Sequence, residues 1–209
     1  MSAFAERVIA YTGRDIIYQP FSLAGQGIAR EGLEDAYPMS QLQLAMMVDD
    51  LRDGVGSTYS EVIHYLVERP FHCASFESAL SAVYKRHALL RARFDVSKQQ
   101  TPHIFILSEV APLLSVEYLD EQSESAQRAY IGGEVERLRN VPFQFECAPL
   151  LSIHVYVLSD SKFLLLYKTH HSLWDGWSEA MLTSELLSLY EHPAGIEAYL
   201  AQPTHAGYH

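Results

Sequence analysis

Two adjacent histidines, His170 and His171, follow an apolar run, and His170 stands five residues before the pair Asp175-Gly176. An imidazole changes its charge near neutral pH, so a histidine in a cleft can hold a nucleophile in place and accept its proton. Histidines also occur in protein cores, where a hydrogen bond satisfies them. The pair by itself is therefore compatible with either a catalytic role or a role in core packing. The elements around it have to distinguish the two.

The apolar run from Phe163 to Thr169 predicts a β-strand that leads into the two histidines. Successive side chains of a strand point to opposite faces. One face holds Phe163, Leu165, Tyr167, Thr169 and His171, and the other holds Leu164, Leu166, Lys168 and His170. If strand geometry continues through them, the two histidines cannot both reach one substrate. One of them can open into a cavity while the other is held in packing.

The elements next to this strand are predicted from turn and helix signals. A strand from Leu151 to Leu158 and a turn at 159–161 precede the run, which is the pattern of a hairpin. After Asp175 a helix is predicted to about Glu191, where a proline and a glycine follow. Its inward residues are predicted to be Met181, Leu182, Leu186, Leu189 and Tyr190. The segment from Ala194 to His209 is expected to be a loop.

The first part of the chain alternates helices and strands. Helices are predicted for Gln41–Leu51, Ala74–Leu90 and Gln122–Asn140, and strands for Ser60–Glu68, Arg91–Asp95, Pro102–Leu107 and Ser115–Leu119. Ser40 and Gln43 form a capping box at the first helix. Ser75 is the candidate N-cap of the second, and Gly132-Gly133 could break the third. This order indicates an α/β (α+β) fold with a mixed sheet flanked by helices.

Composition limits the classes of function. With 209 residues, 48% of them hydrophobic, the chain can bury the core of one domain or of one lobe of something larger. A formal net charge of −11 argues against nucleic-acid binding, which requires a basic surface. The sequence contains no recognisable membrane span or signal peptide, and its two cysteines, Cys73 and Cys147, are isolated, which is typical of a cytoplasmic protein. The other histidines are scattered without ligand spacing, so no metal site is predicted.

Three motifs together resemble one known family. They are His-His-x-x-x-Asp-Gly from His170 to Gly176, Tyr-Pro-Met-Ser-x-Leu-Gln from Tyr37 to Gln43, and Arg-His-x-x-Leu-Arg-x-x-Phe from Arg86 to Phe94. They resemble motifs of the condensation domains of nonribosomal peptide synthetases, in the superfamily that includes chloramphenicol acetyltransferase. The third match is partial, because Ala88 and Ala92 stand where the family has Glu and Thr.

The resemblance implies a reaction and its partners. It implies amide formation between a thioester on a donor carrier protein and an amine on an acceptor carrier protein. Both substrates hang on phosphopantetheine arms that enter a tunnel between two lobes, and the domain itself binds no cofactor. Residues 35–209 would be the N-terminal lobe of this two-lobed fold, with the C-terminal lobe absent, and residues 1–34 a leader or inter-domain linker. Such a lobe would be inactive alone and would expose an apolar inter-lobe face through which it could self-associate.

The resemblance also assigns roles to residues of the central motif. His171 would position the attacking amine and could accept its proton, and Gly176, which lacks a Cβ, would let a pantetheine arm approach. His170, Asp175 and Arg86 would support the site structurally, with Arg86 pairing with Asp175. Two further residues of the motif region have alternative roles: Ser178 would stabilise an oxyanion or bond the helix start, and Trp177 would belong to the core or the tunnel wall.

Three alternatives remain open on the sequence. An epimerization domain shares the His-His motif but moves a proton at Cα. An O-acyltransferase would use acyl-CoA and a free alcohol, although the phrase from Tyr37 to Gln43 favours the synthetase. A non-catalytic half-domain would only dock carrier proteins.

Overall fold

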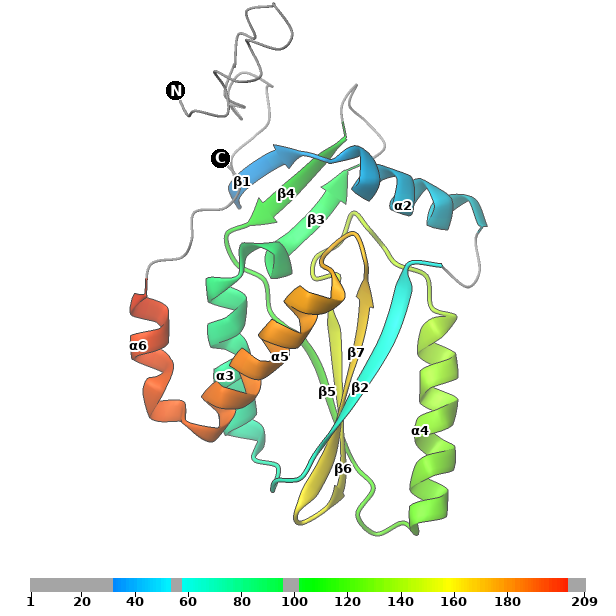
Figure 1. Ribbon diagram of the computed structural model, residues 1–209, viewed down its shortest axis with the longest axis vertical. Coiled ribbons are helices and arrows are strands. Elements are labelled where there is room, and N and C mark those ends of the chain that lie inside the picture. Colours follow the sequence, from blue (N-terminus) through cyan, green and yellow to red (C-terminus); the bar gives the residue numbers. More distant parts are fainter. Residues whose placement is uncertain (1–31, 54–57, 96–101, 203–209) are drawn as a thin grey trace, which may run out of the picture. The chain divides into compact units, whose positions relative to one another are not determined.

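The computed structural model describes residues 32–53, 58–95 and 102–202 of the chain. The strands are β1 (Leu33–Pro38), β2 (Ser60–Val67), β3 (Ala92–Asp95), β4 (His103–Leu107), β5 (Leu113–Tyr118), β6 (Ser152–Ser159) and β7 (Lys162–His170). The helices are α2 (Gln41–Asp53), α3 (Cys73–Arg86), α4 (Glu124–Arg139), α5 (Gly176–Glu191) and α6 (Ile196–Ala201), with short 3₁₀ turns η1 (Ala88–Arg91) and η2 (Pro193–Gly195). Figure 1 shows the strands gathered into two sheets with helices beside them.

A four-stranded mixed sheet carries His170 at the end of β7. Its strand order is β2-β7-β6-β5, and β7 runs antiparallel to both β2 and β6. β5 runs parallel to β6, and the connection between them contains α4, because parallel neighbours need a crossover. The predicted hairpin is confirmed, with Val155 of β6 opposite Leu165 of β7. The predicted α/β class, a mixed sheet flanked by helices, is confirmed.

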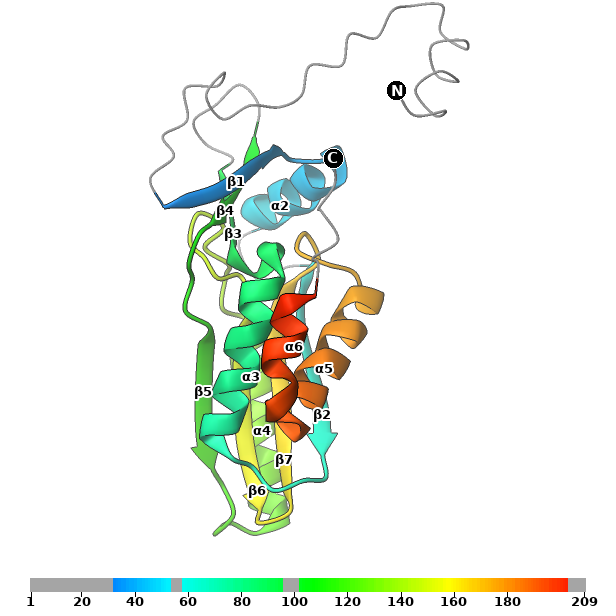
Figure 2. The same cartoon turned by 90° about the vertical axis from the view of Figure 1, so that its left-hand side faces the viewer.

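The alternation predicted for β7 is confirmed, and both faces of the strand are buried. The face packed in the larger core, with α3 and α5, holds Phe163, Leu165 and Tyr167, and the face packed in the smaller core, with α4, holds Leu164 and Leu166. Figure 2 shows α3 and α5 on one side of this sheet and α4 on the other. The end of β7 therefore lies inside the protein, and His170 lies with it.

A second sheet, which the local patterns did not indicate, contains the remaining three strands. Its order is β1-β4-β3, and all its pairs are antiparallel. Its side chains Phe94 and Ile106 join the larger core together with Met47 of α2. A hydrophobic pattern identifies a strand but not its neighbour, so the division into two sheets is a property of the tertiary fold.

Helix ends agree with the sequence at some positions and differ at others. The capping box is confirmed: the Ser40 N–H donates to Gln43 Oε1 at 3.1 Å, and the Gln43 N–H donates to Ser40 Oγ at 3.2 Å. The N-cap of α3 is His72, so the prediction of Ser75 is wrong. α4 runs unbroken through Gly132 and Gly133, whose missing side chains face open space.

Two predictions for the C-terminal region are wrong. The expected loop after Ala194 contains η2 and α6, and α6 packs beside α3. Met181, expected to point inward, is 53% exposed, whereas Leu182, Leu186, Leu189 and Tyr190 are buried as predicted. At the other end, the predicted leader 1–34 lies outside the described residues except for its last three, of which Leu33 and Glu34 belong to β1.

Candidate active site

His170 is fully buried and bonded at both ring nitrogens. Its Nε2 lies 2.8 Å from Oδ2 of Asp50 on α2, and its Nδ1 accepts the Ser172 N–H at 3.1 Å. The Ser172 hydroxyl also contacts Nδ1, at 2.7 Å. Because Nδ1 accepts a backbone N–H, the proton of the neutral ring sits on Nε2 and is donated to Asp50.

Aromatic rings surround His170 and remove it from water. The ring centroid of Phe145 lies 4.9 Å away and that of Phe143 5.4 Å away, both edge to face. Burial lowers the pKa of His170, and the Asp50 carboxylate acts in the opposite direction. His170 is therefore a neutral, hydrogen-bonded residue of the core.

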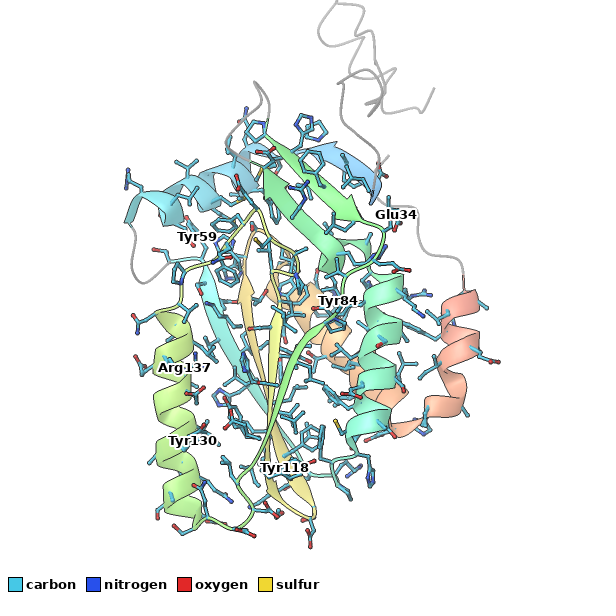
Figure 3. The ribbon with its side chains drawn as sticks, turned by 180° about the vertical axis from the view of Figure 1, so that it is seen from behind. Glu34, Tyr59, Tyr84, Tyr118, Tyr130 and Arg137 are labelled. Carbon is cyan, nitrogen blue, oxygen red and sulfur yellow. The ribbon has the colours of Figure 1, made fainter. Side chains whose placement is uncertain are left out.

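The loop after β7 is held by hydrogen bonds from two other elements. The Gln43 side chain donates from Nε2 to the Ser172 carbonyl at 3.0 Å, while its Oε1 serves the capping box. Tyr59, labelled in Figure 3, lies just before β2, and its carbonyl accepts the His171 N–H at 2.9 Å. Sequence reasoning identified Gln43 as part of a capping box and of a motif but missed its contact with the loop. It also missed Asp50, which carries no local signal.

His171 lies in a different environment from its neighbour. Its side chain is 33% exposed, and its Nε2 lies 2.9 Å from Oε1 of Glu61, which is 36% exposed. Glu61 belongs to β2, where it pairs with Thr169 of β7. One imidazole is thus reachable from solvent just beyond the end of β7, and the other is sealed. Glu61 is a further residue that sequence reasoning missed.

The expected ion pair between Arg86 and Asp175 is absent from the described structure, and the prediction is wrong. Asp175 is the N-cap of α5, and its Oδ1 accepts the Ser178 N–H at 2.9 Å, a bond that lowers the pKa of this exposed carboxyl. Arg86 donates to the Tyr199 carbonyl at 2.7 Å and lies 4.6 Å from the Tyr199 ring centroid. Arg86 therefore binds α6, an element that the sequence did not predict.

The start of α5 presents open surface next to this loop. Gly176 is the first residue of α5, and a Cβ there would meet nothing within 4 Å. The backbone N–H of Ser178 is used by the cap. Trp177 is 78% exposed, which excludes the core from the two places expected for it and leaves the tunnel wall. It borders an open, shallow groove of about 340 Å³, lined also by Ala180, Met181, Ser184 and Glu185.

Lys168 is an unexpected buried charge on the same face of β7 as His170. Its ammonium donates to the Val141 carbonyl and lies 4.6 Å from the Phe143 ring centroid. Burial, with a smaller effect of Arg137 on α4 (Figure 3), lowers the pKa of Lys168 to about 8. Phe143 therefore lies against both Lys168 and His170, and it couples the segment after α4 to the end of β7.

No group of three or more His, Cys, Asp or Glu side chains in residues 32–53, 58–95 and 102–202 could hold a metal ion. In the same part of the chain, none of the helices combines the length and apolar character needed to cross a membrane.

Comparisons with known proteins agree on one family. Residues 33–209 match the condensation domain family. The AMB antimetabolite synthetase AmbE of Pseudomonas aeruginosa is 29% identical over 196 residues, which are 91% of this chain and 9% of that protein. Bacitracin synthase 1 of Bacillus licheniformis is 26% identical over 159 residues, 76% of this chain and 3% of that protein. The chain thus spans a small fraction of either synthetase.

Solved structures share the fold at low sequence identity. The starter condensation domain of rhizomide synthetase RzmA superposes with a TM-score of 0.65 and 17% identity, over 84% of this chain and 43% of that chain. The cyclization-docking bidomain of EpoB from Sorangium cellulosum superposes with a TM-score of 0.67 and 16% identity, over 84% of this chain and 33% of that chain. The predicted fold, one lobe of a chloramphenicol acetyltransferase-like architecture, is confirmed. The chain belongs to the condensation-domain family of nonribosomal peptide synthetases.

Proposed function

We propose that this chain is the N-terminal lobe of a condensation domain that joins a donor thioester and an acceptor amine. Both substrates would be carried on phosphopantetheine arms of separate carrier domains. The observation that supports this most is the contrast between adjacent histidines: His170 is sealed and bonded to Asp50, whereas the side chain of His171 is 33% exposed at the sheet's end. The imidazole of His171 is therefore available to a substrate, and the buried bond of His170 holds the adjacent backbone in place.

His171 would act on the amine of the acceptor. The amine nitrogen attacks the thioester carbonyl, the new C–N bond forms, and the C–S bond breaks to release a thiol. An imidazole within reach of that nitrogen can orient its lone pair and accept the proton that it loses. The open space at Gly176 suits the approach of a pantetheine arm along the start of α5.

A second lobe would complete the site. This chain covers 43% of the solved rhizomide starter domain, so more than half of that structure has no counterpart here. Trp177 and Met181 on α5, and Leu42, Val48 and Leu51 on α2, are exposed apolar residues that a second lobe could cover. We infer that residues 35–209 form a lobe that is inactive alone, that residues 1–34 link it to a neighbouring domain, and that it works in the cytoplasm.

Binding of a loaded carrier domain tests this proposal without requiring turnover. We expect an aminoacyl carrier domain to shift the backbone NMR signals of the loop from His171 to Asp175 and of Gly176, and a carrier without its pantetheine arm to leave them unchanged. Acyl-CoA causing the same shifts without any carrier would favour the O-acyltransferase instead. Exchange of the Cα proton of the bound aminoacyl group would favour epimerization. No response to any of these ligands would contradict the proposal.

A further inference from the structure

Glu179 is a carboxylate in the first turn of α5 that is almost sealed from water, since the residue is only 4% exposed. Burying a carboxylate is costly unless hydrogen bonds replace its hydration. Two hydroxyl groups do so here: the Tyr65 hydroxyl donates to Oε2 at 2.8 Å, and Thr183 Oγ1 donates to Oε1 at 3.0 Å. Burial, with a further contribution from the bond to Glu179, raises the pKa of Tyr65 to about 12, so this hydroxyl keeps its proton at neutral pH.

The two hydroxyl partners of Glu179 belong to different elements. Thr183 lies one helical turn further along α5, and its hydroxyl also contacts the Glu179 carbonyl at 3.0 Å, so this contact is local to the helix. Tyr65 belongs to β2, where it pairs with Leu165 of β7, and it is 114 residues from Glu179 in sequence. The bond between Tyr65 and Glu179 is therefore a direct polar tie between the start of α5 and the four-stranded sheet.

β2 holds both ends of the loop after β7. At the start of the loop, the His171 N–H donates to the carbonyl of Tyr59, just before β2, at 2.9 Å. At its end, the Glu179 N–H donates to the Asp175 carbonyl at 3.0 Å, and the Glu179 side chain reaches Tyr65. Because β2 pairs with β7 along its whole length, these two points of attachment keep a fixed spacing.

We propose that Glu179 is a positioning residue that, through Tyr65, fixes the start of α5 on β2 and so sets the spacing between His171 and Gly176. The tie stands on the two hydrogen bonds, and its use in the reaction rests on the proposed function. There His171 meets the acceptor amine and Gly176 lies beside a pantetheine arm. The amine and the thioester react only if these two groups are held at one spacing.

Amide hydrogen exchange of the 209-residue chain tests the tie. Tyr65→Phe removes only the hydroxyl that bonds Glu179. Under native conditions, the N–H groups of Ser178 and residue 179, which are both bonded to Asp175, report local opening of the start of α5. We expect these two amides to exchange about fivefold faster in Tyr65→Phe, because the loss of one hydrogen bond shifts a local equilibrium by about that factor.

Tyr190→Phe is the matched control, because it removes a tyrosine hydroxyl at the other end of the same helix. The Tyr190 hydroxyl accepts the His72 N–H at 2.9 Å and donates to the Pro70 carbonyl at 2.5 Å. Its loss should lower the unfolding free energy at least as much as Tyr65→Phe does. It should nevertheless leave the exchange of the two amides at the start of α5 unchanged.

Two substitutions of Glu179 separate the hydrogen bonds from packing. In Glu179→Gln, the amide oxygen can accept from Tyr65 and the amide N–H can donate to Thr183 Oγ1, whose own proton still reaches the carbonyl of residue 179. This variant should exchange like the wild type. Glu179→Met has a similar size but no hydrogen-bonding group of this kind, so the two amides should exchange faster. A role in packing alone would be retained by Glu179→Met.

Titration with an aminoacyl carrier domain tests the use of the tie. We expect Kd to rise about fivefold in Tyr65→Phe and Glu179→Met, because the arrangement of the loop that binds the arm is populated less. Kd should match the wild type in Tyr190→Phe and Glu179→Gln. Faster exchange combined with an unchanged Kd in Tyr65→Phe and Glu179→Met would overturn the role of Glu179 in positioning.

The outcomes are distinct from those that test the proposed function. Unchanged exchange at the start of α5 in both Tyr65→Phe and Glu179→Met, or an equal acceleration in Tyr190→Phe, would overturn the tie, and carrier binding by the wild type would be unaffected. Conversely, a wild type that binds no carrier, but whose exchange depends on Tyr65 and Glu179 as expected, would refute the proposed function and leave the tie between α5 and β2 intact.

Discussion

Asp50 on α2 and His170 on β7 are 120 residues apart in sequence, yet His170 Nε2 donates to Asp50 Oδ2 at 2.8 Å inside the protein. The contact joins the helix that follows β1 to the end of the central strand. Since His171 is the next residue along the chain, the backbone position of the exposed imidazole depends on this buried bond.

Replacing Asp50 should therefore destabilise the fold. Asp50→Ala leaves the buried N–H of His170 without its acceptor, which costs about 2 kcal/mol of unfolding free energy. Urea denaturation followed by circular dichroism measures the loss. Asp49→Ala, on the same helix but in an exposed pair with Arg52, is the control and should change the free energy by no more than about 0.5 kcal/mol. Equal effects of the two variants would refute the role of the buried bond.

Gln43 has two separable roles, and one substitution divides them. Gln43→Glu keeps an oxygen for the Ser40 N–H but removes the amide that donates to the Ser172 carbonyl. We expect normal helicity, a loss of about 1 kcal/mol of unfolding free energy, and faster hydrogen exchange of the loop from His171 to Asp175. Gln41→Glu in the same helical turn should leave this exchange unchanged. Unchanged exchange in Gln43→Glu would mean that the amide does not hold the loop.

Lys168 should make stability rise with pH above neutrality. Its pKa falls from about 10.4 in an unfolded chain to about 8 in the folded protein, because burial disfavours the ammonium. Between these values the unfolded state binds more protons, so the free energy of unfolding increases with pH. Comparing wild type with Lys168→Met at pH 7.5 and pH 9.5 isolates this contribution from that of the tyrosines.

The expected gain of the wild type relative to Lys168→Met is about 1–3 kcal/mol between those two pH values. Lys162→Met changes an exposed lysine at the other end of β7 and is the control, which should follow the wild type. If the unfolding free energies of wild type and Lys168→Met changed with pH in parallel, Lys168 would have the same pKa in the folded and unfolded states. That result would contradict the prediction.

Arg86 and Asp175 should act independently of each other. Asp175→Ala removes the N-cap of α5, and Arg86→Ala frees α6 from the end of α3. Because the residues share no contact, the double variant should lose the sum of the two single losses in unfolding free energy. Limited proteolysis should cut α6 faster only in variants that lack Arg86. If the two losses in unfolding free energy were not additive, the result would instead support the Arg86–Asp175 ion pair expected from the sequence.

The isolated chain should self-associate through its exposed apolar side chains. Size-exclusion chromatography at several concentrations should show earlier elution as concentration rises, because Leu42 on α2 and Trp177 on α5 are left uncovered. The double variant Leu42→Ser/Trp177→Ser should weaken this dependence. Tyr118→Ser, which changes an equally exposed residue on β5, should not. Concentration-independent elution of the wild type would contradict the expectation.

Local pattern was sufficient for most of the elements and for placing the two histidines on opposite faces of β7. Alternation along β7 and the capping box at Ser40 are encoded within a few residues, because burial and capping act over one strand or one helical turn.

The contacts that define the site are of another kind. Asp50, Glu61 and the loop bond of Gln43 join segments about 110 to 130 residues apart, and nothing near these residues in sequence marks their partners. Arg86 illustrates the same limit, because its partner is α6. The position of α6 beside the end of α3 depends on how the chain folds back after α5. The sequence alone determined most of the strands and helices, though not β1 or α6, and it placed the two imidazoles on opposite faces of one strand. Only the tertiary structure decided which side chains meet across the ends of those elements, because strand pairing and helix packing, not local periodicity, bring them within bonding distance.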